Sequence, residues 1–240
     1  MAGLSFGNNM DRIVVISGAG ISAESGLQTF RGPSGLWRGH RPEEVACPQA
    51  WQRDPGLVLA FYNERRRAVR AASPIVAHRT LVDLERCYNV HIVTQNVDDL
   101  HERAGSSNIL HLHGEIRKAR STCDSTMVIH LGNKDLYVGD VCPLGGQLRP
   151  HIVWFGERVT AMDQAERIVG EADVLIVVGT SLMVHPANWL IHAASPQARR
   201  ILINPEIPES ITGQGFEVVA EMATVGVPGV VADLLAKASR

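Results

Sequence analysis

Short apolar runs rich in β-branched residues recur along the chain and predict buried strands. Each run is bounded by turn-forming or polar residues, as the strands of a parallel sheet usually are. The predicted strands span residues 12–16, 90–94, 152–154, 174–179 and 201–204. Patterns typical of helices lie between them, at residues 75–87, 161–170, 186–194 and 227–238. Strands alternating with helices indicate an α/β fold, and we predict a doubly wound, Rossmann-like parallel sheet.

Two stretches interrupt this alternation. Residues 32–73 contain no strand-like run and look helical, above all at 57–70, whereas residues 117–149 are polar and contain glycines. We interpret both as excursions that form a smaller lobe within a single domain of residues 1–240. The Rossmann-like core would comprise approximately residues 10–31, 74–116 and 150–240, with a ligand cleft between the two lobes.

Composition excludes several classes of protein. The 240 residues are 45% hydrophobic, and 23 basic against 25 acidic side chains give a net charge of −2. This balance gives no reason to expect nucleic-acid binding, and no apolar run approaches the roughly 20 residues of a membrane span. Residues 1–12 lack the basic start and apolar stretch of a signal peptide. The four cysteines form no disulfide framework, so we expect a cytoplasmic protein, or a mitochondrial one if the source is eukaryotic.

A glycine-rich turn follows the first predicted strand. Residues 18–23 fit the pattern G-x-G-x-x-G/A, in which glycines let the backbone approach a pyrophosphate. Glycine turns after strands are common, so a purely structural role is an equally good interpretation of this motif alone. A dehydrogenase would carry an acidic residue about 20 positions further on. That position falls in the loop-like stretch 28–37, which counts against hydride transfer.

Polar side chains follow the strand predicted at residues 90–94. Gln95, Asn96 and Asp98 offer amide and carboxylate groups suited to a carboxamide and to ribose hydroxyls. The simpler alternative is a helix start at which Asn96 or Asp98 is the cap. Because ligands bind at the carboxyl ends of the strands in such sheets, the whole cluster favours a binding site.

Two histidines, His111 and His113, lie on the same side of a further predicted strand. A metal pair is conceivable, but no third ligand is within obvious reach. A lone histidine is more often structural than catalytic. Imidazole titrates near pH 6.5, however, so His113, next to Gly114 at a strand end, is a candidate proton acceptor.

The sequence resembles the sirtuins over nearly its whole length. The resemblance rests on the segments GAGISAESGLQTFRG, TQNVDDLHERAG, HLHGE, LRPHIVWFGE, VGTSLMVHPA and INPE, in this order and spacing. It is closest to the bacterial-type (class III) subgroup that removes acidic acyl groups from lysine.

This resemblance implies roles for individual residues. His113 would be the general base. NAD, which is consumed as a co-substrate, would be bound by Gly18, Ala19, Gly20, Phe30, Arg31, Gln95, Asn96, Asp98, Gly179, Thr180, Ser181, Asn204 and Glu206. The substrate peptide would add a strand beside residues 153–157, contacting Val153, Phe155 and Gly156.

The implied reaction is NAD-dependent removal of succinyl, malonyl and acetyl groups from lysine in proteins, which yields nicotinamide and O-acyl-ADP-ribose. The enzyme would act as a monomer, without nucleic acid or membrane. Two alternatives are a protein ADP-ribosyltransferase and a non-catalytic module that binds NAD or ADP-ribose. The intact HLHGE segment favours deacylation.

Tyr62 and Arg65 are three residues apart and share one face of the helix predicted at 57–70. A phenol and a guanidinium on one face can bind a carboxylate. The pattern alone favours a solvated basic helix, because Arg66 and Arg67 follow. The resemblance reverses that preference, since sirtuins that accept succinyl- or malonyl-lysine carry this pair, and Ala46 aligns with a small residue that leaves room for the acyl chain.

Many sirtuins hold a structural zinc ion with two C-x-x-C pairs. Here each pair retains one cysteine, Cys123 and Cys142, and Thr126 occupies the position of another. Tetrahedral zinc needs four ligands. Asp124 or His130 could substitute, but the spacing does not demand it, so we predict that zinc is absent.

Overall fold

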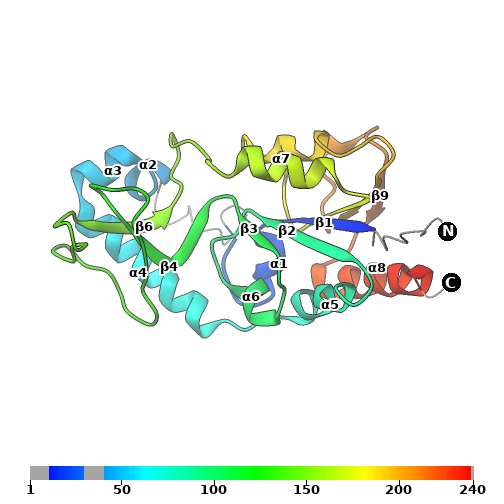
Figure 1. Cartoon of the computed structure of the whole chain (residues 1–240), viewed down its shortest axis with the longest axis horizontal. Helices are drawn as coiled ribbons and strands as arrows, with labels where there is room; N and C mark the ends of the chain where they lie inside the picture. Colours follow the sequence, from blue (N-terminus) through cyan, green and yellow to red (C-terminus); the bar gives the residue numbers. More distant parts are fainter. Residues whose placement is uncertain (1–10, 30–40, 239–240) are drawn as a thin grey trace, which may run out of the picture.

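A six-stranded, entirely parallel sheet forms the larger part of the computed structural model, which describes residues 11–29 and 41–238 (Figure 1). The strand order is β3-β2-β1-β7-β8-β9. Neighbouring strands pair in parallel throughout. The strands are β1 (Arg12–Ser17), β2 (Asn89–Thr94), β3 (Ile109–His111), β7 (Val174–Val178), β8 (Arg199–Ile203) and β9 (Phe216–Val219).

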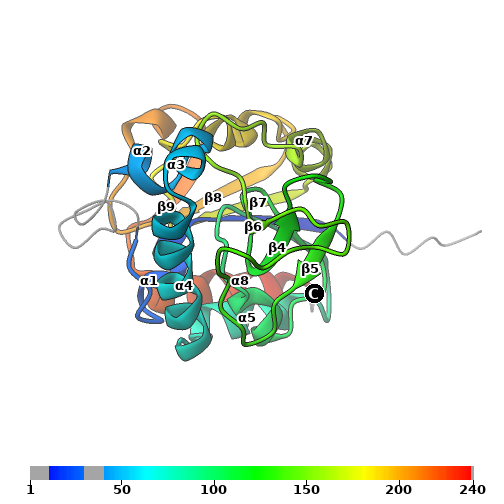
Figure 2. The ribbon, with the colours of Figure 1, turned by 90° about the vertical axis from the view of Figure 1, so that its left-hand side faces the viewer.

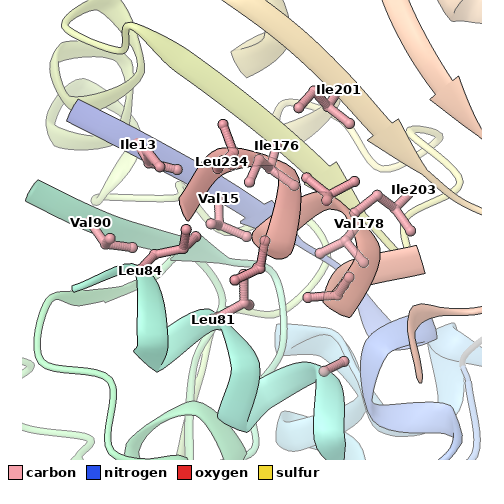
Figure 3. Close-up of a cluster of buried hydrophobic side chains, with 14 of the residues drawn as sticks. Ile13, Val15, Leu81, Leu84, Val90, Ile176, Val178, Ile201, Ile203 and Leu234 are labelled. Atoms are coloured by element: carbon pink, nitrogen blue, oxygen red, sulfur yellow. The ribbon is translucent and has the colours of Figure 1, made fainter. Parts of the chain in front are cut away.

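Helices cover both faces of this sheet, as the doubly wound prediction requires. One face carries α5 (Val76–Leu84) and α8 (Ala223–Ala238), and the other carries α7 (Met162–Gly170) and the 3₁₀ helix η2 (Ala187–His192) (Figure 1). Figure 3 shows Leu81 and Leu84 of α5 packed with Leu234 of α8 against the strands. Burying one such leucine completely contributes about 1.5–3 kcal/mol. The apolar runs of the sequence are therefore the core of this sheet.

A second, antiparallel sheet occupies the other end of the molecule, with the order β5-β4-β6. Its strands are β4 (Gly114–Ser121), β5 (Val128–His130) and β6 (Leu148–Ile152). Three helices pack with it: α2 (Pro42–Val45), α3 (Pro48–Arg53) and the long α4 (Pro55–Ala71), which stands beside the sheet in Figure 2. We call this sheet and these helices the small lobe.

Most predicted elements are confirmed, but the strand expected at 152–154 is wrong. The chain is extended earlier, in β6, and pairs with β4 in the small sheet rather than with the parallel sheet. Residues 117–149, for which we predicted no strand, contain most of β4 and all of β5. β4 is mostly polar and β5 is only three residues long, and most residues of both strands remain partly or fully exposed.

The chain order places a topological switch point at one end of the parallel sheet, and we call the region at the carboxyl ends of the strands there the crevice. From β1 the chain builds β2 and β3 on one side, then returns to build β7, β8 and β9 on the other. At such a switch point the loops after neighbouring strands diverge, which opens space for a ligand at the carboxyl ends of the strands. Among the helices in the described ranges, none combines the length and the apolar character that crossing a membrane requires.

Candidate active site

The glycine turn after β1 is packed directly against the turn after β7. The Gly18 N–H donates to the carbonyl of Val178 at 3.0 Å, and the Gly20 N–H donates to the carbonyl of Gly179 at 2.7 Å. A Cβ atom on Gly18 would lie 2.7 Å from the Gly179 oxygen, and one on Gly179, whose φ is +61°, would lie 2.4 Å from the Ile21 nitrogen. Backbone packing thus requires these glycines, whether or not a nucleotide binds above them.

A buried polar cluster joins the loop after β2 to α1 (Ala19–Ala23). The Asn96 amide donates to the Gly18 carbonyl and to the Ser22 hydroxyl, both at 3.1 Å, and the Ser22 hydroxyl donates to Asp98 at 3.0 Å. Asn96 and Asp98 are only 4% and 7% exposed. Burial raises the pKa of Asp98, against the opposing effect of its hydrogen bonds. Sequence reasoning did not identify Ser22, because a serine inside a glycine-rich turn gives no signal of its two partners.

The helix-cap alternative is wrong for both Asn96 and Asp98, because the cap of α6 (Leu100–Ala104) is Asp99, which makes no side-chain cap hydrogen bond. The second oxygen of Asp98 accepts the Leu100 N–H at 3.1 Å, at the start of α6. Asn96 caps nothing and holds α1 instead. The cluster therefore combines a local hydrogen bond at a helix start with a long-range connection across the crevice.

The two histidines both reach this loop, but their hydrogen bonds differ. His113 Nδ1 lies 3.0 Å from the Gln95 carbonyl, and His111 Nδ1 lies 2.9 Å from the Asn96 carbonyl. A carbonyl only accepts, so each Nδ1 carries the proton. His111 Nε2 lies 2.7 Å from Glu102, which also only accepts. Both nitrogens of His111 thus donate, whereas Nε2 of His113 is left as a basic lone pair.

The pKa values of His113 and His111 accordingly shift in opposite directions. Burial lowers the pKa of His113 below its usual 6.5, although the bond to Gln95 opposes this. Burial also disfavours the charged form of His111. The hydrogen bond to Glu102 and the negative charge of Glu102 outweigh this effect of burial and raise the pKa of His111. Of the pair, His113 is therefore the imidazole whose neutral form is favoured, and His111 is the one whose charged form is stabilised. Within the ranges described, no group of three or more metal-ligating side chains occurs.

We expect a defined acid limb in the pH profile of any reaction that uses His113 as a base. The base works only when neutral, so kcat/KM is lost as the pH falls through the lowered pKa, and is retained above it. Measured on an acetyl-lysine peptide, the half-maximal point should lie below about pH 6.5. A half-maximal point at or above roughly pH 7 would contradict this assignment.

The remaining candidate nucleotide-binding residues surround the same crevice. The Gln95 amide donates to the Thr180 hydroxyl at 3.1 Å, which connects the loops after β2 and β7, and Ser181 is exposed beside it. After β8, the Asn204 amide donates to the Glu206 carbonyl, and the Glu206 side chain is exposed. Phe30 and Arg31 lie outside the described residues.

Tyr62 and Arg65 lie on α4 at the side of the small lobe that carries Ala46. Tyr62 is 6% and Ala46 5% exposed, and both belong to one apolar cluster with Trp154. Burial raises the pKa of Tyr62, so the phenol remains a neutral donor. Burial lowers the pKa of Arg65 to about 10, which leaves it charged at neutral pH, and its guanidinium lies 4.9 Å from the centre of the Phe61 ring.

The residue pattern alone favoured a solvated basic helix for α4, and this interpretation is wrong. Arg66 is fully buried and donates to the Ile116 carbonyl at 2.8 Å. Arg67 forms an ion pair with Asp135, and Arg70 approaches the same carboxylate to 3.5 Å. These arginines therefore hold the small lobe together.

The segment after β6 connects the histidine to the small lobe. The Val153 N–H donates to the His113 carbonyl at 2.9 Å, and the Phe155 N–H donates to the Ala46 carbonyl at 3.0 Å. Phe155 is 50% exposed and Gly156 adopts a φ of +87°. The sequence did not predict the hydrogen bond to Ala46. Together the two hydrogen bonds place residues 153–157 between His113 and the apolar cluster that contains Tyr62.

Comparisons with known proteins agree with this arrangement. A family model described as the Sir2 family matches residues 18–186. A protein of Aggregatibacter actinomycetemcomitans named NAD-dependent protein deacylase is 55% identical over 192 residues, which cover 80% of this chain and 92% of that protein. A protein of Helicobacter pylori with the same name is 46% identical over 230 residues, which cover 96% and 100%.

Solved structures show the same fold. A mutant Sir2 homologue in complex with ADP ribose superimposes with a TM-score of 0.88 at 38% identity, covering 96% of this chain and 94% of that one. A Sir2 homologue in complex with NAD gives a TM-score of 0.85, also at 38% identity, covering 95% and 91%.

Proposed function

The chain belongs to the Sir2 family and is an NAD-dependent protein deacylase, and we propose that it removes succinyl and malonyl as well as acetyl groups from lysine side chains. The proposal that succinyl and malonyl groups are removed rests on one observation, the pair Tyr62 and Arg65. The buried neutral phenol of Tyr62 belongs to one apolar cluster with Ala46, and the partly buried guanidinium of Arg65 lies three residues further along the same helix. Ala46 is in turn hydrogen-bonded to the segment that leads to His113.

The crevice residues fit NAD by the chemistry of their donors. Amide, carboxylate and hydroxyl groups of Gln95, Asn96, Asp98 and Thr180 converge there from the loops after β2 and β7. Such groups suit a carboxamide and ribose hydroxyls, and the turn at Gly18–Gly20 suits a phosphate. We extend the nucleotide site to Ala19, Gly179, Ser181, Asn204 and Glu206, and, outside the described residues, to Phe30 and Arg31. NAD, when bound, supplies a ribose carbon from which nicotinamide can leave.

His113 would accept a proton from a ribose hydroxyl through Nε2. The bond from Nδ1 to the Gln95 carbonyl fixes the tautomer and points the basic nitrogen away from the loop. His111 cannot take this role, because both its nitrogens donate. It instead holds the Asn96 backbone in position, one residue after the carbonyl that orients His113.

Tyr62 and Arg65 would bind the distal carboxylate of the acyl group. Arginine binds a carboxylate with two parallel hydrogen bonds, and the raised pKa of Tyr62 keeps its proton available for a third. The small side chain of Ala46 would leave space for the carbon chain between this pair and His113. Acetyl-lysine lacks the carboxylate but would still reach the base.

The segment at Val153, Phe155 and Gly156 would bind the backbone of the substrate by adding a strand. Its Phe155 is 50% exposed. A Sir2 protein that is 25% identical to this chain, with a TM-score of 0.78, was solved with a deacetylated p53 peptide and an acetyl ADP-ribose. A short peptide is therefore the substrate that we propose for this surface.

Two other activities use the same nucleotide site: ADP-ribosyl transfer to a protein, and NAD binding without catalysis. Neither requires a carboxylate-binding pair on α4. The test is to incubate the protein with NAD and peptides that carry acetyl-, malonyl- or succinyl-lysine, and to analyse the products by mass spectrometry. We expect free lysine, nicotinamide and O-succinyl-ADP-ribose from the succinyl peptide. ADP-ribose attached to protein, or no turnover of the succinyl peptide, would contradict the proposal.

A further inference from the structure

The sulfur atoms of Cys123 and Cys142 meet at one end of the small sheet, 3.8 Å apart. Cys123 follows β4 at its Ser121 end, whereas His113 precedes β4 at the opposite end. The pair therefore lies outside the active site already described. All four cysteines are unpaired, and Cys123 is exposed while Cys142 is only 2% exposed.

Backbone hydrogen bonds hold the two cysteines in this arrangement. The Thr122 N–H donates to the Gln147 carbonyl at 3.0 Å, and Val141 pairs with the same Gln147 in an antiparallel bridge. The Cys142 N–H donates to the Gly146 carbonyl at 2.8 Å. A Cβ atom on Gly146 would come within 2.4 Å of the Cys123 sulfur, so glycine at this position leaves room for that sulfur beside Cys142.

A tetrahedral zinc ion does not fit these residues. Structural zinc takes four ligands, and no cluster of three or more candidate ligands is found among residues 11–29 and 41–238. The two possible substitutes are engaged elsewhere. Asp124 accepts the N–H of Thr126 at 2.9 Å and its hydroxyl at 2.7 Å, and His130 accepts the Gly132 N–H at 3.1 Å. Two thiols remain, without further ligands.

We propose that Cys123 and Cys142 form a reversible disulfide when the protein meets a hydroperoxide. A disulfide requires sulfurs about 2.05 Å apart, so the two sulfurs, which lie 3.8 Å apart, must approach each other by roughly 1.8 Å. Exposed Cys123 gives the oxidant access, and Cys142 is the shielded partner. Ser121 lies between them: its hydroxyl is 3.1 Å from the Cys123 sulfur and donates to the Cys142 sulfur at 3.2 Å.

The chemistry balances with hydrogen peroxide as the oxidant. Cys123 loses its thiol proton and the thiolate attacks one peroxide oxygen, so an S–O bond forms, the O–O bond breaks, and the leaving hydroxide takes up that proton as water. The Cys142 thiolate then attacks the sulfenic sulfur, so the S–S bond forms, the S–O bond breaks and a second water leaves. A dithiol reductant reverses the reaction, as expected of cytosolic disulfides.

The bond would tie the end of β4 to the loop before β6. It would serve as the covalent cross-link of the small lobe in place of a metal. Because His113 lies at the far end of β4, deacylase activity should change by less than about twofold on oxidation.

The experiment uses the full chain, reduced and treated with a chelator, then exposed to hydrogen peroxide near one equivalent. We expect an intact-mass loss of about 2 Da, a fall in free thiols from four to two, and a 123–142 cross-linked peptide that dithiothreitol removes. Cys87→Ser, which removes another exposed cysteine, should still form the cross-link, whereas Cys123→Ser and Cys142→Ala should not.

Three outcomes would overturn the proposal. One is a mass gain of oxygen without a cross-link, another is a disulfide between chains or to another cysteine, and the third is about one zinc per chain that protects both thiols. Circular dichroism of the variants separates a lost cross-link from a lost fold. Since the readout is the state of the thiols, the result does not depend on the acyl group that the enzyme removes.

Discussion

Replacing His113 with alanine is expected to lower kcat/KM for deacylation by about 10²- to 10⁴-fold, the usual contribution of a positioned general base. The variant should still bind NAD, because His113 contacts the loop through the Gln95 carbonyl and not through the Asn96–Asp98 cluster. Calorimetry or fluorescence with NAD measures the binding, and product formation from an acetyl-lysine peptide measures the activity.

His192→Ala is the matched control for this experiment. His192 is exposed on η2 and belongs to neither candidate site, so its variant should keep full activity. If His113→Ala retained more than roughly a tenth of the activity, His113 would not be the base. An inactive wild-type protein that binds NAD would instead favour the non-catalytic alternative.

The central strands β1, β2, β7 and β8 could be predicted from sequence because most of their residues are buried, whereas the edge strand β9, whose residues are partly or fully exposed, was not predicted. The run at β7, for example, is buried at every residue, and such strands read as uninterrupted apolar segments. The small sheet could not be predicted in this way. In β4 and β5 most residues are partly or fully exposed, and β6 even contains Pro150. None of these three strands has an apolar run as long as that of β7.

The residues of the candidate site also differ in how far the sequence could predict their roles. Gln95, Asn96 and Asp98 could be chosen because they end a recognisable strand. The sequence favoured His113 over His111 only by its place beside Gly114, because the hydrogen bonds that distinguish them involve Glu102 and two backbone carbonyls that the fold brings near. Side-chain types alone do not reveal which imidazole nitrogen is left to accept a proton.

Arg65→Met is expected to reduce desuccinylation by about ten- to hundredfold while changing deacetylation by less than about threefold. A hydrogen bond to a charged group contributes roughly 1.5–3 kcal/mol, which corresponds to that range. Burial lowers the pKa of Arg65 only to about 10, so the wild-type guanidinium is charged under assay conditions and its loss removes a full positive charge. Methionine preserves much of the apolar stem, which packs near Phe61.

The control for Arg65→Met is Arg67→Met, on the same helix. Arg67 pairs with Asp135 in the small lobe, so its loss should affect both acyl substrates equally, through stability. The ratio of kcat/KM for succinyl and acetyl peptides is the decisive quantity, because a general loss of folding cancels in it. An Arg65→Met variant in which both activities fall in parallel would remove the pair from the acyl site. A ratio that changes only for Arg65 would locate the substrate carboxylate at α4 and would make the small lobe the part of the enzyme that selects the acyl group.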